Sequence, residues 1–431
     1  MPPSRTETAT AELLPSANTP AQPVPGRQDP SVHPSSESVS LGIEAILEYA
    51  DAHAPVLLSA RAQAELAQAQ ERGAELVLKE NPELELSAGL QQAGSDSAPV
   101  FELTLSQRFE FAGESRLRLE TALAAQRNAN AQLQVERWSL RSELYSLYVE
   151  LLLSREQVQL RRRFADFYIS LQQILSKQAE AGELDPIALL AAETEFTLAQ
   201  EALLLAQQQE TRLHQQLVSV AGYTGDPNDW RIEGTLPSIQ DLPELATLRA
   251  LMRENHPAFQ GAASAVELSQ SQLALQEREA WPEPSLSLSY SRENGLANER
   301  DANTVQLGLS LPLPFWQLNQ EARALAETQL SLAQRQQVKT VQQLVASLEL
   351  AYLELEAAHQ RLSLFKDSIF PSIDEQLALL QRAYQLGELD LYEASRSRET
   401  LLQASERYLQ ALGDYHRAAN TLNTLGMTPP D

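Results

Sequence analysis

The side chains best suited to chemistry in this 431-residue sequence are scattered, and they form no recognisable catalytic or metal-binding motif. There is no cysteine, which excludes thiolate nucleophiles, disulfides and cysteine-ligated zinc. The histidines show no spacing typical of metal ligands: His33, His53, His214, His256, His359 and His416. No Ser/His/Asp arrangement, glycine-rich phosphate loop or H-E-x-x-H helix stands out. The sequence therefore predicts a protein that is not an enzyme and needs no cofactor.

One short motif, Gly-Glu-Leu-Asp, occurs twice. It comprises Gly182, Glu183, Leu184 and Asp185, and again Gly387, Glu388, Leu389 and Asp390. Glycine suits the left-handed position after a helix, and aspartate suits the N-cap of the next helix. Each motif therefore predicts a tight turn between two helices. Such a turn exposes main-chain groups and apolar side chains to another helical hairpin, although capping alone explains the glycine and the aspartate.

The rest of the sequence also repeats, with corresponding positions roughly 202 to 205 residues apart. Glu-Leu-x-Gln-x-Gln occurs at 65–70 and at 267–272, and Leu-x-Leu-Ser occurs at 103–106 and at 307–310. Self-similarity over such a length indicates two equivalent structural units.

The elements that must position these turns follow from proline, glycine and apolar patterns. The first repeat is expected at 41–222, with a helix, strands at about 83–91 and 100–111, a long helix at about 114–180, a turn at 181–186 and a return helix at 187–221. The second is expected at 243–427, with a helix, strands at about 284–292 and 304–312, a long helix at about 316–383, a turn at 386–390 and a return helix at 391–425. A linker at 223–242 joins the repeats. Residues 1–40 are rich in proline and serine, and we expect a disordered leader without the apolar core of an export signal.

The predicted long helices resemble coiled coils. Between Gly113 and Gly182 there is no other glycine and no proline, and leucines recur every three or four residues, as in Leu140, Leu144 and Leu147. The second long helix has a similar pattern, and Pro371 predicts a kink or a short break within it.

The predicted strands alternate apolar and polar residues, which is typical of half-buried strands. Hairpin loops are expected at 94–97 and 294–303. Aromatic residues suited to a membrane interface flank the strands: Trp281, Phe315 and Trp316. Four strands leave open edges, so a transmembrane barrel would need other copies, and three copies would give twelve strands. The alternative is a soluble sheet under a helix.

The overall charge narrows the possible partners. A formal net charge of -25 argues against nucleic acid, whose phosphates require clustered lysine and arginine. No stretch of about 18 apolar residues is present, which argues against a transmembrane helix.

Two segments where a strand leads into a long helix resemble a known family. Residues 108–116 contain Glu110, Gly113 and a basic residue, and residues 311–320 read Pro-Leu-Pro-Phe-Trp-Gln-Leu-Asn-Gln after Leu311. Because of these two segments and the repeat, the chain from about residue 43 to residue 427 resembles the TolC-like outer-membrane efflux proteins, and specifically their cation-efflux branch. Ala112 departs from the second glycine common in that branch.

This resemblance implies a mainly α-helical homotrimer with a small β part, in which a twelve-stranded outer-membrane barrel continues into a periplasmic α-helical tunnel. It also implies that the two Gly-Glu-Leu-Asp turns dock onto a periplasmic adaptor (membrane fusion) protein and an inner-membrane pump. The expected function is passive export of metal cations or small toxic compounds, in contact with outer-membrane lipid.

The resemblance further suggests a gate near the second turn. Counted from Gly387, Tyr384 and Glu393 match the family's gate-linked tyrosine and acidic positions, and the next acidic position falls on Arg396. Arg396 could instead pair with Glu393. A solvated helix face is the alternative explanation of these residues.

Two other functions remain open at this stage. The same fold serves as an outer-membrane channel for type I protein secretion, which differs in its pump. A soluble helical scaffold or adaptor is the third possibility, but an adaptor should contain one hairpin flanked by β-rich domains, whereas two hairpins are predicted here.

Overall fold

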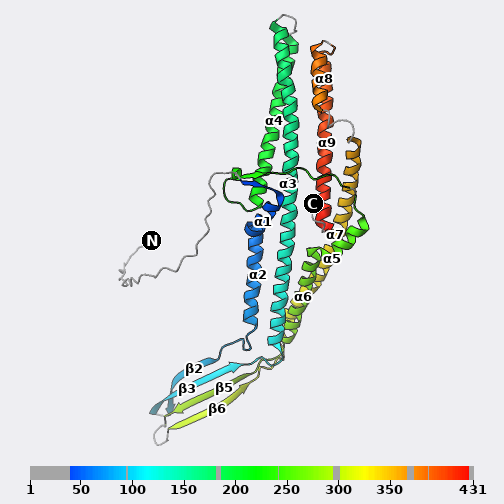
Figure 1. The fold of residues 1–431 in the computed structure, drawn as a ribbon. Coiled ribbons are helices and arrows are strands. Elements are labelled where there is room, and N and C mark those ends of the chain that lie inside the picture. The colour runs from blue at the N-terminus through cyan, green and yellow to red at the C-terminus, as the bar shows by residue number, and fades with distance from the viewer. Residues whose placement is uncertain are drawn as a thin grey trace, which may run out of the picture. The chain divides into compact units, whose positions relative to one another are not determined.

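Helices dominate the described chain, and strands form a small part of it, as the sequence predicts (Figure 1). The computed structural model describes residues 39–93, 96–180, 186–240, 242–294, 301–365, 373–386 and 388–426. Residues 39–431 form one unit. The leader expected at 1–40 lies outside the described residues, except that Val39 and Ser40 belong to a strand.

The first half of this unit contains β1 (Val39–Leu41), α1 (Ile43–His53), α2 (Pro55–Ala74), β2 (Glu83–Ala93), β3 (Asp96–Arg108), α3 (Glu114–Glu180) and α4 (Pro186–Val220). The 67 residues of α3 span about 100 Å at 1.5 Å per residue. Pro55 and Pro186 each occupy the first helical position, where the missing N–H has no intrahelical partner to lose.

The second half contains the 3-10 turn η1 (Pro227–Asp229), β4 (Trp230–Ile232), α5 (Leu245–Asn255), α6 (Pro257–Arg278), β5 (Ser285–Glu293), β6 (Ala302–Ser310), α7 (Gln320–Phe365), α8 (Ile373–Gln385) and α9 (Leu391–Gly426). Helix α7 starts at Gln320 rather than at about 316, directly after Asn319, whose φ of 56° is left-handed. The kink or short break expected at Pro371 falls within residues 366–372, which lie outside the described residues.

The four longer strands form one antiparallel sheet in the order β2-β3-β5-β6. Pairing of β2 with β3 extends to Ala93 and Asp96, so the loop is shorter than the predicted 94–97, and Gly94 and Ser95 lie outside the described residues. Strand β3 ends at Arg108 rather than at 111. Phe109 still donates its N–H to the carbonyl of Pro284 over 2.9 Å, but proline has no N–H to return the bond, so regular pairing with β5 stops there. Figure 1 shows this sheet at one end of α2, α3, α6 and α7, with the ends of the α3/α4 and α8/α9 pairs opposite.

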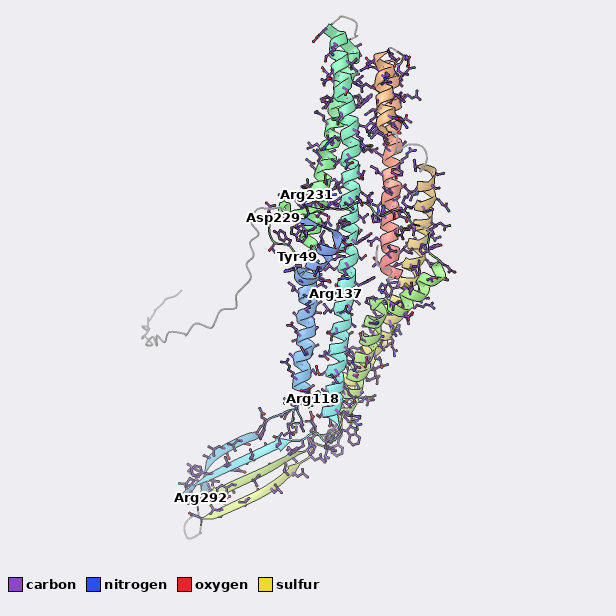
Figure 2. All side chains as sticks on the ribbon, viewed as in Figure 1. Tyr49, Arg118, Arg137, Asp229, Arg231 and Arg292 are labelled. Carbon is purple, nitrogen blue, oxygen red and sulfur yellow. The ribbon has the colours of Figure 1, made fainter. Side chains whose placement is uncertain are left out.

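The linker expected at 223–242 is not all loop. Strand β4 pairs in parallel with β1, from Val39 opposite Trp230 to Leu41 opposite Ile232. The ring of Trp230 lies 5.0 Å from that of Tyr49, edge to face, and 4.9 Å from that of Tyr223. This aromatic cluster ties α1 to the end of α4, and Figure 2 shows Tyr49 and Asp229 lying near each other.

Two apolar clusters hold the helices together. One joins α1, the start of α2, the middle of α3 and the end of α4, and it includes Leu144 and Leu217. The other joins the part of α3 after Leu160 to α5, α7, α8 and α9, and it includes Leu348 and Leu422. Leu144 belongs to the leucine pattern predicted for the first long helix, Leu348 lies in the second long helix, and both are fully buried.

Candidate functional site

The sheet has one apolar and one polar face, because successive side chains point to opposite sides of a strand. The apolar face carries two aligned rows: Leu84, Leu105, Leu288 and Leu307, and then Leu86, Leu103, Tyr290 and Val305. The polar face carries two others: Glu85, Thr104, Ser289 and Gln306, and then Ser87, Glu102, Ser291 and Thr304. The register thus aligns like with like across all four strands.

The apolar face of the sheet is not covered by any described part of the chain. Each of the eight apolar side chains in those rows is at least 41% exposed, and Leu307 reaches 74%. A soluble sheet under a helix would bury this face, so that alternative is wrong for the described residues. An apolar face of this extent marks a surface that contacts a partner or lipid.

The sheet also has two open edges. Among the described strands, β2 and β6 are the outermost, and each pairs on one side only. Unpaired edges present a row of N–H and C=O groups that can pair with another chain.

The two junctions between sheet and helix share one turn. Gly113 has a φ of 90° and Asn319 a φ of 56°, so both are left-handed. The first helical side chain then accepts a hydrogen bond from the N–H two residues back: Glu114 from Ala112 over 2.9 Å, and Gln320 from Leu318 over 2.7 Å. These turns explain the Gly-Glu and Asn-Gln pairs in the segments that carry the family resemblance.

Exposed apolar side chains surround these junctions. Trp316 is 84% exposed, and Phe315, Trp281 and Phe111 are also exposed. The sequence prediction missed the exposed segment Leu76–Val77–Leu78 after α2, which has no periodic pattern. Arg118 marks the first junction in Figure 2, and Arg292 lies toward the far end of the sheet. Aromatic residues in this position suit the boundary between lipid and water.

The connection between α8 and α9, at the second Gly-Glu-Leu-Asp motif, is capped as its residue types suggest. The N–H of Glu388 donates to the carbonyl of Ala383 over 2.9 Å, which is the 6→1 hydrogen bond of a Schellman motif at the end of a helix. Asp390 accepts from the N–H of Glu393 over 2.7 Å, and the Glu393 carboxylate accepts from the N–H of Asp390 over 3.3 Å. This reciprocal pair is a capping box. Gly387 and the first turn, Gly182 to Asp185, lie outside the described residues.

The gate candidates lie in different environments. Tyr384 is buried in the cluster of α8 and α9, and burial raises the pKa of its hydroxyl. Glu393 and Arg396 are exposed, and in the described part of the chain no ion pair joins them. The carboxylate of Glu393 instead accepts a hydrogen bond from the main chain. The residue type alone could not distinguish this capping role from a role in gating.

Two helices carry exposed apolar stripes. Helix α4 presents Ile187, Leu190, Leu198 and Leu205, and α7 presents Leu325, Leu332, Leu350, Leu353 and Leu364. Within each helix these positions are spaced by about whole turns, so each set lies on one face. Both stripes are uncovered by the described residues.

The described residues contain no group of three or more His, Cys, Asp or Glu side chains that could hold a metal ion. His256 and His416 are buried, and burial lowers the pKa of both imidazoles. None of the described helices combines the length and the hydrophobicity needed to span a bilayer.

Known proteins resemble this chain in sequence and in fold. Residues 248–426 match the family model for outer membrane efflux proteins. The cobalt-zinc-cadmium resistance protein CzcC of Cupriavidus metallidurans is 24% identical over 316 residues, which are 73% of this chain and 74% of the relative. These findings confirm the resemblance to outer-membrane efflux proteins and to their cation-efflux branch.

Solved structures of outer-membrane channels share the fold. The outer membrane protein VceC of Vibrio cholerae aligns with a TM-score of 0.70 at 17% identity, over 89% of this chain and 96% of that one. CusC, described as undergoing transmembrane channel formation, aligns with a TM-score of 0.69 at 17% identity, over 96% and 98% of the two chains.

Proposed function

We propose that this chain, whose residues 248–426 match the outer membrane efflux protein family, is the outer-membrane exit duct of an efflux system. Substrates pass through it from a periplasmic adaptor and an inner-membrane pump to the exterior, and no bond is made or broken. The observation that carries the proposal is the uncovered apolar face of the four-stranded sheet. In a membrane, this face contacts hydrocarbon while the polar face lines a water-filled lumen.

The open edges of the sheet support a homotrimer. Lipid tolerates no unpaired strand edge, so β6 of one copy pairs with β2 of the next. The strands alternate in direction across the sheet, and these two edges therefore meet antiparallel. Three copies give a twelve-stranded barrel, whereas the eight strands of a dimer would leave an interior that side chains fill.

The exposed stripes on α4 and α7 support the same assembly in the helical part. They lie on different helices, so a contact between copies joins two unlike surfaces. Unlike surfaces give a head-to-tail interface, which closes into a ring when the rotation fits. The helices of the two repeats then enclose a periplasmic tunnel that continues from the barrel.

The turns at the far ends of the helices are the proposed docking sites for the adaptor, through Gly182, Glu183, Leu184, Asp185, Gly387, Glu388, Leu389 and Asp390. The described ends of the α3/α4 and α8/α9 pairs, next to these positions in the sequence, lie opposite the sheet (Figure 1). Tyr384, Glu393 and Arg396 are the proposed gate residues close behind the second turn.

Metal cations are the proposed cargo class. The resistance protein that this chain resembles is named for cobalt, zinc and cadmium. Glu83, Glu85 and Glu102 lie on the polar face of the sheet, which carries only Arg108 as a basic residue along the paired strands. A lumen lined in this way raises the local concentration of cations.

The proposal is tested by purifying the full chain and measuring mass and conductance. We expect extraction from membranes only with detergent, a particle with three times the mass of one chain, and ion conductance in planar bilayers. Cells that express the chain with its pump and adaptor should accumulate less divalent metal. A monomer that is stable without detergent and conducts no ions would contradict the proposal.

Replacement of Glu393 separates gating from helix capping. Glu393→Gln keeps an oxygen that can accept the N–H of Asp390 but removes the charge, so we expect a leakier closed pore with an intact helix start. Glu393→Ala should leak as much and also lose about 1 kcal/mol of helix stability. Single-channel conductance and thermal melting measure the two effects. Unchanged conductance in the glutamine variant would leave Glu393 with a capping role only.

A further inference from the structure

A cavity of about 890 Å³ lies between the start of α1, the middle of α3, linker residues 233–238 and the end of α9. Small-molecule sites in proteins have volumes of about 300–1,000 Å³ and are predominantly apolar, and this cavity fits both criteria. Its lining includes none of the residues to which the proposed function gives a role. The cavity therefore needs an explanation of its own.

Three aromatic side chains of α3 line the cavity: Trp138, Tyr145 and Tyr148. They are spaced by seven and three residues, so they lie on one face of the helix. The indole N–H of Trp138 donates to the carbonyl of Thr424 over 3.0 Å, and the hydroxyl of Tyr148 donates to the carbonyl of Glu233 over 3.0 Å. These bonds fix two of the three rings before any ligand binds, which lowers the entropic cost of binding.

The wall opposite α3 depends on a glycine. Gly234 has a φ of 154°, and a Cβ atom at this position would collide with the hydroxyl of Tyr148. Further along the cavity, the hydroxyl of Ser142 lies 3.0 Å from that of Thr424, and the side-chain amide of Asn420 donates to the carbonyl of Ser142 over 3.3 Å. The linker, α3 and α9 are therefore joined to one another around the cavity.

One charge in the lining is not balanced. The charged side chains that line the cavity are Glu44, Glu233 and Arg141. Arg141 pairs with Asp51 at 2.5 Å, and Glu233 pairs with Arg231 at 3.6 Å. The carboxylate of Glu44 forms no ion pair and no hydrogen bond with any other residue in the described part of the chain. The cavity thus carries the negative charge of Glu44.

This charge acts on the same space as the aromatic rings. Burial raises the pKa of the Tyr145 and Tyr148 hydroxyls, and the negative charge of Glu44 raises both pKa values further. Both phenols therefore stay protonated at neutral pH and add no charge of their own. The Glu44 carboxylate is close enough to the two tyrosines for one bound molecule to contact all three side chains.

We propose that this cavity is a binding site for an organic cation, whose apolar groups contact Trp138, Tyr145 and Tyr148 and whose charge lies beside Glu44. The faces of aromatic rings attract cations, and a carboxylate adds to that attraction. An anion would be repelled by the ring faces and by Glu44. A divalent metal ion requires more oxygen ligands than one carboxylate supplies. The inference does not depend on the proposed function, because binding requires neither membrane insertion nor conduction.

The test is calorimetric titration of the full chain, in nonionic detergent, with benzyltriethylammonium as the cation and benzenesulfonate as the anion. The heat of titration into detergent alone is subtracted. Glu44→Gln removes the charge and keeps the shape of the side chain, and Tyr145→Leu removes one ring. Glu48→Gln is the matched control, because Glu48 is an exposed carboxylate one turn further along α1 and does not line the cavity.

We expect saturable binding of the ammonium ion and no binding of the sulfonate. Glu44→Gln should weaken the affinity about tenfold and Tyr145→Leu about fivefold, whereas Glu48→Gln should match the parent. The ammonium ion should also raise the melting temperature of the parent more than that of Glu44→Gln at the same concentration. Circular dichroism of each variant without ligand shows whether it is folded.

Four results would overturn the site: no binding of either ion, equal binding of both ions, an equal loss of affinity in Glu44→Gln and Glu48→Gln, or binding only after removal of residues 427–431. The third would reduce the effect to net charge, and the fourth would assign the cavity to the C-terminal residues of the chain itself. Selective binding by a chain that conducts no ions would support the site and contradict only the proposed function.

Discussion

Leu307→Arg is expected to prevent membrane insertion of the protein, whereas Gln306→Arg is expected to leave insertion intact. The two residues are neighbours in the middle of β6 and point to opposite faces of the sheet. An arginine on the lipid face at the bilayer midplane costs about 2–4 kcal/mol, or about 6–12 kcal/mol for three copies. On the lumen face the same side chain remains in water.

The pair of variants also discriminates between the membrane and the soluble hypotheses. Leu307 is 74% exposed in the single chain, and in a soluble protein a substitution at such a position would change stability by about 0.5 kcal/mol or less. The fraction of protein in the outer-membrane pellet and the amount of heat-sensitive trimer measure the outcome. If Leu307→Arg inserts and conducts like the parent, the apolar face does not contact lipid.

Local patterns were sufficient to predict the four long strands. Period-two alternation depends only on neighbouring residues, and the register then followed the apolar pattern, as in the row from Leu84 to Leu307. Strand ends were less predictable. Asp96 belongs to β3 because it pairs with Ala93, whereas Phe109 lies beyond the strand because Pro284, opposite it, has no N–H to complete the pair.

Contacts between distant segments were not predictable. Strands β1 and β4 have three residues each, and their pairing joins positions 191 residues apart, such as Val39 and Trp230. Nothing near Trp230 in the sequence identifies that partner. The start of α7 at Gln320 was equally unpredictable. It depends on the left-handed Asn319, whose side-chain amide donates to the carbonyl of Gln276 over 2.9 Å.

In the candidate site too, local features could be predicted from the sequence, whereas contacts between distant segments could not. The capping role of Asp390 follows from its type and its place before a helix, and its hydrogen bond with Glu393 was accessible to local reasoning. The ion pair between Arg398 on α9 and Glu195 on α4 was not, because the two residues are 203 positions apart and arginine is usually a surface residue. The sequence therefore directed attention to Arg396, which is exposed, rather than to Arg398, which is buried.

Acidification is expected to destabilise the parent protein more than the His416→Leu variant. His416 is 4% exposed, its Nε2 atom has no hydrogen-bond partner, and burial lowers the pKa of its imidazole to about 4. The unfolded chain has a histidine pKa of about 6.5, so it binds a proton first as the pH falls. The folded state therefore keeps its full stability above about pH 6.5 and loses about 3 kcal/mol between that pH and pH 4 from this residue alone.

Thermal melting of the helical signal at pH 7 and at pH 4.5 measures this effect. The melting point of the parent should fall further between the two conditions than that of His416→Leu, while His53→Leu, at an exposed histidine, should behave like the parent. Carboxylates titrate over the same range, but they are common to all three proteins and cancel in the comparison. Because leucine also removes the unpaired Nε2, the variant should be at least as stable as the parent at pH 7. Equal acid sensitivity in all three proteins would mean that His416 gains water or a partner when it is protonated, and that its burial does not limit the stability of α9.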